Sequence, residues 1–258
     1  MNKKPLILVT NDDGIKAPGI RALISVANEI GEVIVVAPDR PRSAMGHAIT
    51  INKPLYCKEE EIDNGPQTEY SSSGTPADCV KLAIHELLSK KPDLCISGIN
   101  HGSNSSVNIV YSGTMSAALE AGMEGIPSIG FSLLNYDWDI DFSPYKTYVK
   151  KICLEVLKNG LKKGVSLNVN IPHIKKREIK GVKICRQADA NWIEKFDKRI
   201  SPMKKTYYWL TGKFINYDKG TDTDEWALEN GYISIVPVKF DFTDTNYIEK
   251  LKNWNFDE

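Results

Sequence analysis

Two adjacent aspartates, Asp12 and Asp13, stand in an Asn-Asp-Asp-Gly turn at residues 11–14, directly after an apolar run. Neighbouring carboxylates repel one another unless a cation or hydrogen-bond donors compensate their charges. Gly14 permits the tight backbone turn that brings both carboxylates toward one point, and carboxylate oxygens suit hard cations such as Mg²⁺ or Mn²⁺. The turn therefore predicts a metal site, although Asp-Gly is also common turn chemistry that needs no ligand.

A second polar segment, at residues 37–43, follows the next apolar run and offers the hydroxyl of Ser43. It also carries Arg40 and Arg42, and arginine suits phosphate because its planar guanidinium can donate two parallel hydrogen bonds. A surface loop with solvated charges explains the same residues. Taken alone, this segment therefore does not indicate phosphate binding; it supports phosphate binding only together with the other polar segments.

The third segment extends from residue 97 to residue 114 and contains Asn100 and Asn104 before Ser112-Gly113-Thr114. Small residues let backbone N–H groups approach an anion closely, and the free amides of a helix N-terminus attract phosphate. A helix cap preceded by a loop is the plainer explanation, but a loop of this length inside a compact α/β domain is usually functional. This segment gives the strongest indication of phosphate binding.

Each of the three segments follows a short apolar run, and such runs alternate with helical patterns. Runs rich in β-branched residues predict strands at residues 6–10, 33–37, 94–97, 126–132 and 165–171. Amphipathic spacing predicts helices at residues 18–30, 76–89, 113–123 and 145–161. This alternation predicts an α/β fold with a mostly parallel sheet sandwiched by helices. Ligands bind such sheets beyond the carboxyl ends of the strands, which is where the three polar segments lie.

Two stretches break the alternation. Residues 48–72 predict short strands and turns, the first of them at residues 48–51. Residues 186–221 are polar with interleaved aromatic residues, and the alternating segment 206–211 predicts one arm of a hairpin, which on a soluble protein most often packs on a partner subunit. We therefore divide the single domain of residues 1–258 into an α/β catalytic core, 1–185, and a hairpin with a C-terminal arm, 186–258.

The composition is that of an ordinary soluble globular protein, with 41% apolar and 26% charged residues. Lys+Arg and Asp+Glu both number 33, so the net charge gives no general attraction to polymeric nucleic acid or to a membrane surface. No apolar run approaches the roughly 18 residues of a membrane span, and the opening run is too short for a secretion signal. The five cysteines lack disulfide-framework spacing, which favours free thiols in the cytoplasm.

Several common catalytic motifs are missing from the chain. It has no G-x-G-x-x-G after a strand, no G-x-x-x-x-G-K-[ST] and no G-x-S-x-G elbow, which disfavours dinucleotide enzymes, P-loop NTPases and α/β-hydrolases. The four histidines show no metal-ligand spacing, which disfavours zinc. His101 lies in the third polar segment and His47 in the loop just after the second, and loop histidines are more often bystanders than acids.

A set of motifs occurs in one order along nearly the whole chain. The motifs are Val9-Thr10-Asn11-Asp12-Asp13-Gly14 with Ala17-Pro18-Gly19, Ala37-Pro38-Asp39 through Ser43, Gly74-Thr75-Pro76-Ala77-Asp78-Cys79-Val80, Ser97-Gly98-Ile99-Asn100 with Gly102 and Asn104, and Tyr111-Ser112-Gly113-Thr114. A C-terminal pattern follows, Gly220-Thr221-Asp222-Thr223-Asp224 and Gly231-Tyr232-Ile233-Ser234. Together these motifs resemble those of the SurE (survival protein E) nucleotidase family.

The resemblance implies a cytoplasmic phosphatase that hydrolyses nucleoside 5′-monophosphates, and in some members 3′-monophosphates and short polyphosphate, with one Mg²⁺ or Mn²⁺ ion per subunit. It also implies a Rossmann-like core whose C-terminal arm is exchanged between the subunits of a homodimer or homotetramer. Carried over by position, the metal ligands are Asp12, Asp13, Ser43 and Asn100, the first two also being catalytic. The residues that border the phosphate are Asn104, Ser112, Gly113 and Thr114.

The chain departs from this pattern at Ser106 and Asn108, where many relatives have Gly and Asp, and Asn108 removes a negative charge near the expected phosphate. We expect water as the nucleophile with Asp12 or Asp13 as its base, and an aspartyl-phosphate intermediate stays open. Two other classes also stay open. One is a non-catalytic nucleotide sensor, and the other is a Mn²⁺-dependent sugar-nucleotide glycosyltransferase, which usually needs the spaced Asp-x-Asp that the first turn lacks.

Overall fold

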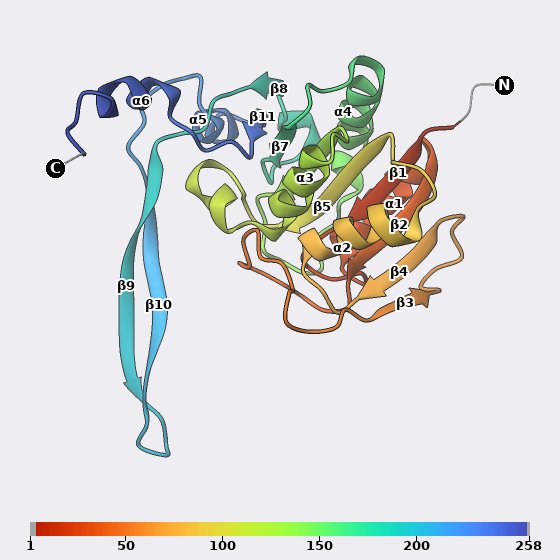
Figure 1. The fold of residues 1–258 in the computed structure, drawn as a ribbon, viewed down its shortest axis with the longest axis horizontal. Coiled ribbons are helices and arrows are strands. Elements are labelled where there is room, and N and C mark those ends of the chain that lie inside the picture. The colour runs from red at the N-terminus through yellow and green to blue at the C-terminus, as the bar shows by residue number, and fades with distance from the viewer. Residues whose placement is uncertain (1–3, 257–258) are drawn as a thin grey trace.

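A nine-stranded sheet runs through the computed structural model, which describes residues 4–256, in the strand order β3-β4-β2-β1-β5-β6-β7-β11-β8 (Figure 1). The strands are β1 (Leu6–Thr10), β2 (Glu32–Pro38), β3 (Cys57–Glu60), β4 (Thr68–Ser72), β5 (Leu94–His101), β6 (Ser128–Leu133), β7 (Val165–Ile171), β8 (Gly181–Ile184) and β11 (Tyr232–Lys239). Strand β3 pairs antiparallel with β4, and β11 pairs antiparallel with β7, while the other neighbours are parallel. The predicted mostly parallel α/β fold is confirmed.

Helices cover both faces of the sheet. They are α1 (Pro18–Asn28), α2 (Pro76–Leu82), α3 (Gly113–Met123) and α4 (Lys146–Asn159). Two further helices are α5 (Asp224–Glu229), which packs against β11, and α6 (Thr245–Leu251), none of whose residues is buried. Short helical turns are η1 (Ala83–Leu87), η2 (Ser106–Tyr111), η3 (Ser143–Tyr145) and η4 (Lys176–Glu178). Strand β1 shows how the layers form, because its side chains alternate between the faces. Ile7 and Val9 join the core beneath α1 and α4, whereas Leu6 and Leu8 join the core beneath α2 and α3.

Two predicted elements differ in the structure. The helix expected at residues 76–89 ends at Leu82 and continues as the π-helical turn η1. No strand forms at residues 48–51, because this segment bonds to the start of α2 instead of to a neighbouring strand. The backbone N–H of Thr50 donates to Asp78 Oδ1 at 3.0 Å, and the Thr75 hydroxyl donates to the Ala48 carbonyl at 2.7 Å.

The C-terminal third does not separate from the core at residue 186. Strand β11 lies inside the large sheet between β7 and β8, and α5 packs against it. The part that projects is the antiparallel hairpin of β9 (Ala190–Ile200) and β10 (Thr206–Asn216), which extends well away from the sheet in Figure 1. The predicted hairpin arm at residues 206–211 is part of β10.

Two further expectations concern the cysteines, expected as free thiols, and the absence of a membrane-spanning segment. All five cysteines are free, and all but Cys57 are buried. None of the helices within residues 4–256 has the length and apolarity that a bilayer crossing requires.

Candidate metal and phosphate site

A hollow of about 340 Å³ opens where β1 and β5 end, and we call it the carboxyl-end hollow. Its lining includes these residues singled out from the sequence: Asp12, Asp13, Ser43, Asn100, Asn104 and Ser112. They come from three loops that are far apart in the chain, and the parallel pairing of β1 with β2 and β5 brings the loops to one edge of the sheet. This is the position expected for ligands in such sheets.

Asp12 is held by the start of α3. The Thr114 hydroxyl donates to Asp12 Oδ1 at 2.6 Å, and the side chain of Thr114 is fully buried. A Cβ added at Gly113 would come within 2.6 Å of the Asp12 Cβ, so only glycine fits beside this carboxylate. Gly113 and Thr114 therefore contact Asp12 and do not line the hollow, whereas Ser112, which caps α3 by accepting from the Met115 N–H, does line it.

The two carboxylates lie in an environment that disfavours their charged form. Burial, followed by the charge of Asp13, raises the pKa of Asp12 to about 6, although hydrogen bonds from Thr114 act in the opposite direction. Burial also raises the pKa of Asp13, whose Oδ2 accepts the His101 backbone N–H at 3.3 Å. Arg40 and Arg42 do not relieve this, because their ion pairs are with Asp39 and the Arg42 guanidinium donates to the Ser73 carbonyl. In the described chain, no lysine or arginine lines the hollow.

The donor set suits a hard divalent cation. Among residues 4–256 no three or more His, Cys, Asp or Glu side chains come together as a metal site. A cation in this hollow would therefore have only two carboxylates as ligands, together with neutral oxygens. Asn100 donates its Nδ2 to the Gly102 carbonyl at 2.9 Å, which leaves its Oδ1 free to act as a ligand. Ser43 adds an exposed hydroxyl. Oxygen donors with two negative charges match Mg²⁺ or Mn²⁺ and not a soft metal.

Asn104 is fixed by buried polar residues that the sequence reasoning missed. Its backbone N–H donates to Asn170 Oδ1 and its Nδ2 donates to Ser132 Oγ, both at 2.8 Å. Asn168 donates to the Asn104 carbonyl at 2.8 Å. The available signal was the pair of asparagines inside the apolar pattern of β7, because buried polar side chains need partners.

The C-terminal segment holds the loop that leads into η2. Asp224 accepts the backbone N–H of Ser106 at 2.8 Å and that of Ala188 at 2.9 Å. Trp192, at the base of the hairpin, donates its Nε1 to Asn108 Oδ1 at 2.8 Å, and Asn108 lines the hollow. Both departures from the family pattern, at positions 106 and 108, thus contact the C-terminal part of the chain.

The two loop histidines have different surroundings. His101 lines the carboxyl-end hollow, and burial lowers its pKa, which favours the neutral ring. His47 lies 2.9 Å from the buried Glu120, which Lys81 also contacts at 2.7 Å. His47 is not among the residues that line this hollow.

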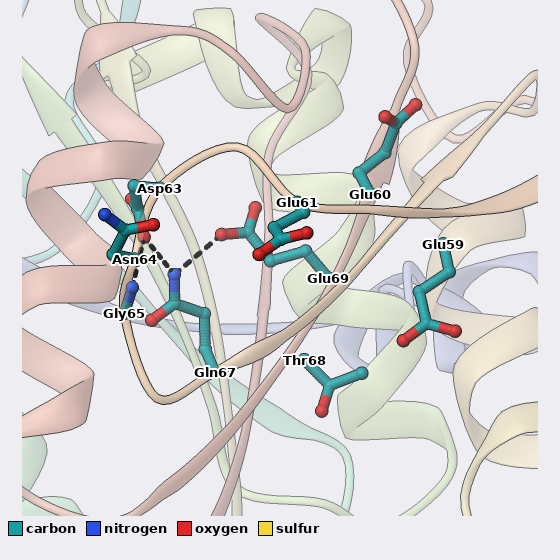
Figure 2. Close-up of a pocket in the computed structure, with 9 residues that line it drawn as sticks. All are labelled: Glu59, Glu60, Glu61, Asp63, Asn64, Gly65, Gln67, Thr68 and Glu69. Atoms are coloured by element: carbon teal, nitrogen blue, oxygen red, sulfur yellow. Dashed lines mark hydrogen bonds between the residues drawn. The ribbon is translucent and has the colours of Figure 1, made fainter.

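A second hollow, of about 600 Å³, lies at the β3–β4 edge of the sheet, and we call it the acidic hollow (Figure 2). Its acidic lining residues are Glu59, Glu60, Glu61, Asp63 and Glu69. Arg21 donates two hydrogen bonds to the Glu69 carboxylate, at 2.8 and 2.7 Å, and forms an ion pair with Asp63 at 3.3 Å. Gln67 donates to Asp63 and Glu69, as Figure 2 shows. Positive charge and amide donors from the chain itself therefore compensate Asp63 and Glu69.

The fold and the carboxyl-end hollow define a doubly wound α/β protein in which oxygen donors from three loops gather beside a helix N-terminus. The family model described as "Survival protein SurE" matches residues 7–194. The chain therefore belongs to the SurE family.

Relatives along the whole chain agree with this assignment. The protein named 5′-nucleotidase SurE of Flavobacterium psychrophilum is 66% identical over 255 residues, covering 99% of each chain. The protein of the same name from Christiangramia forsetii is 63% identical over 257 residues, again covering 99% of each. The crystal structure of the SurE protein from Aquifex aeolicus superposes with a TM-score of 0.83 at 40% identity, covering 96% of this chain and 98% of that one.

Proposed function

We propose that this protein is a metal-dependent 5′-nucleotidase that hydrolyses nucleoside 5′-monophosphates to nucleoside and phosphate. Relatives named 5′-nucleotidase SurE match it over nearly their full length. The observation that carries the metal dependence is the pair of the buried Asp12 and the partly buried Asp13, whose pKa values are raised and whose hollow is lined by no lysine or arginine of the described chain. Such a pair is stabilised when a cation binds.

The residues that would hold the ion are Asp12, Asp13, Ser43 and Asn100, all of which line the carboxyl-end hollow. When bound, Mg²⁺ or Mn²⁺ supplies charge neutralisation at a phosphate oxygen. Thr114 and Gly113 keep the Asp12 carboxylate in place by hydrogen bonding and by close packing. Asn104 and Ser112 border the space that remains for the phosphate.

Hydrolysis needs a group that removes a proton from the attacking water. Asp12 or Asp13 accepts that proton while the water oxygen bonds to phosphorus and the P–O ester bond breaks; the leaving ester oxygen takes a proton from solvent water and becomes the nucleoside hydroxyl. A carboxylate attack that forms an aspartyl-phosphate is the alternative, and trapping of a labelled phosphoprotein separates the two routes.

A substrate panel tests the proposed function. Purified protein is incubated with 5′-nucleotides, 3′-nucleotides and short polyphosphate, with EDTA and after add-back of Mg²⁺ or Mn²⁺, and phosphate release is measured. We expect phosphate release from 5′-monophosphates, abolished by EDTA and restored by the metal. Release from 3′-nucleotides or short polyphosphate would show the additional activities that the family resemblance implies. Nucleotide binding without release indicates a sensor, and release that ignores EDTA contradicts the metal dependence.

We also propose that the protein assembles as a homodimer or homotetramer with exchange of the C-terminal arm. One face of the hairpin carries large apolar side chains, each at least partly exposed: Trp192, Phe196, Ile200, Tyr208, Leu210 and Phe214. Exposed apolar surface of this extent on a projecting ribbon favours burial against another subunit. Light scattering after size-exclusion chromatography should give at least twice the 28.9 kDa chain mass, and a monomer contradicts the assembly.

The free cysteines support a cytoplasmic location as a further part of the proposal, because a reducing compartment keeps thiols unpaired. Fractionation of the producing cells tests it. Recovery with membranes or with secreted proteins contradicts this location.

A further inference from the structure

We propose that Tyr136 is a platform on which the nucleobase of the substrate stacks, and this inference rests on the proposed nucleotidase function. Tyr136 lines the carboxyl-end hollow together with Asp12 and Asp13, and it comes from the loop after β6. Its side chain is 78% exposed. An exposed aromatic ring at the edge of a polar hollow offers a flat apolar face on which another flat ring can stack.

The ring lies against bare backbone on one side. A Cβ added at Gly102 would come within 2.3 Å of Tyr136 Cε1 and 2.8 Å of Cζ, so the ring occupies the space that any other side chain would fill. Gly102 also has a φ of +108°, which other residues rarely adopt. One part of the ring therefore packs on Gly102, while its high exposure leaves the rest open to a ligand.

The loop that carries Tyr136 is fastened by His101. The His101 ring stacks on Trp138, with centroids 5.1 Å apart, and meets Phe142 edge-on at 5.3 Å. Its Nδ1 lies 3.0 Å from the Asp137 carbonyl, a partner that only a protonated Nδ1 can bond. Phe142 is buried at 4% exposure, so this cluster ties the loop to the core. Tyr136 is thereby positioned before a ligand arrives, which lowers the entropic cost of stacking.

The hollow is arranged in the order of a nucleotide's parts. Asp12 is 4% exposed and lies at the deep, charged end, whereas Tyr136 lies at the exposed rim. A phosphate held near the carboxylates and Ser112 places the sugar farther out and the flat base at the rim. Trp138 is no substitute, because it is absent from the lining and one face of its ring is taken by His101.

Stacking on a tyrosine ring is tolerant of base identity because every base presents a π face. The platform should therefore favour nucleoside monophosphates over phosphate esters without a base, and discriminate weakly among the bases. This identifies the chemical class of the leaving group as a nucleoside and explains how a site built from small polar residues distinguishes it from a sugar phosphate.

Two measurements with Tyr136→Ala, Tyr136→Phe and the remote control Tyr56→Ala test the platform. Tyr56 is 72% exposed and does not line the hollow. The first measurement is the ratio of kcat/KM for AMP to kcat/KM for ribose 5-phosphate. The second is the calorimetric Kd of the non-hydrolysable phosphonate analogue of AMP. We expect Tyr136→Ala to lower the ratio and raise the Kd, each by about tenfold, with Tyr136→Phe and Tyr56→Ala close to the wild type.

The outcomes distinguish this inference from the proposed function. If Tyr136→Ala leaves both the ratio and the Kd unchanged while the wild type releases phosphate from AMP, the platform is wrong and the nucleotidase stands. If the wild type releases no phosphate but binds the analogue in a Tyr136-dependent way, the platform stands and the nucleotidase is wrong. A loss for Tyr136→Phe equal to that for Tyr136→Ala would assign the effect to the hydroxyl and overturn stacking.

Discussion

The acidic hollow and the carboxyl-end hollow are built from the same kind of side chain but hold it in opposite electrostatic states. In the acidic hollow, burial raises the pKa of Asp63, but hydrogen bonds from Gln67 and Gly65 and the charge of Arg21 bring it below its usual value. In the carboxyl-end hollow, burial raises the pKa of both Asp12 and Asp13. The proposed site is therefore distinguished by the lack of internal charge compensation and not by the number of its carboxylates.

The difference has a structural cause. The acidic hollow lies at the antiparallel β3–β4 edge, where side chains reach water and where α1 supplies Arg21. Asp12 and Asp13 follow β1, which is flanked by β2 and β5 and covered by helices on both faces. Burial at that position removes water without supplying a cationic side chain, and a bound cation is the compensation that we propose.

Removal of one uncompensated carboxylate is expected to give the largest effect. Asp12→Asn should lower kcat/KM for phosphate release from AMP about 10³- to 10⁴-fold, because it removes a metal ligand and a candidate base. The matched change Asp63→Asn removes a carboxylate that Gln67 and Arg21 already compensate, and activity should stay at the wild-type level. Equal losses in the two variants would abolish the distinction between the hollows.

A substitution in the acidic hollow should instead lower the stability of the protein. Arg21→Ala leaves Glu69, which is 3% exposed, without its cationic partner. We expect the free energy of unfolding to fall by roughly 3 kcal/mol, the lower end of the range for a broken buried pair, because Arg21 itself is partly exposed. Urea denaturation measures this change. The folded fraction should keep its kcat/KM, and a specific loss of activity at unchanged stability would contradict the structural role.

A smaller effect is expected where the support of Asp12 is weakened. Thr114→Val keeps the shape of the side chain but removes the hydroxyl that donates to Asp12 Oδ1. The apparent affinity for Mn²⁺ should fall about 10- to 100-fold, as for other groups that orient a metal ligand. Thr68→Val, in the acidic hollow, is the control. Activation of phosphate release as a function of Mn²⁺ concentration measures both, and wild-type activation in Thr114→Val would remove Thr114 from the site.

Much of this site follows from local sequence. Asp12 and Asp13 come just after the buried strand β1, and this position predicts a functional role for them. The rule that ligands bind at the carboxyl ends of parallel strands predicts that Asn100 and Ser112 lie at the same place. The role of Thr114 was less predictable. From sequence, a helix start with small residues predicts phosphate binding. The close approach of Asp12 to Gly113 and its hydrogen bond from Thr114 show that Gly113 and Thr114 instead contact a carboxylate.

The residues that sequence reasoning did not identify depend on long-range topology. Asn168 and Asn170 contact Asn104 only because β7 lies beside β6, which in turn lies beside β5. Asp224 reaches Ser106 across 118 positions of the chain. The compensation of Asp63 by Arg21 spans 42 positions, so no local pattern separates the compensated carboxylates from the uncompensated ones.

Calorimetric titration of Mn²⁺ into metal-free protein tests the central claim most directly, because it measures whether a cation binds at the uncompensated carboxylates of the carboxyl-end hollow. We expect one site per subunit in the wild type and in Asp63→Asn, and none of comparable affinity in Asp12→Asn, with all three proteins folded by circular dichroism. Equal binding by Asp12→Asn, or loss of binding in Asp63→Asn, would contradict the assignment of the metal site to the carboxyl-end hollow.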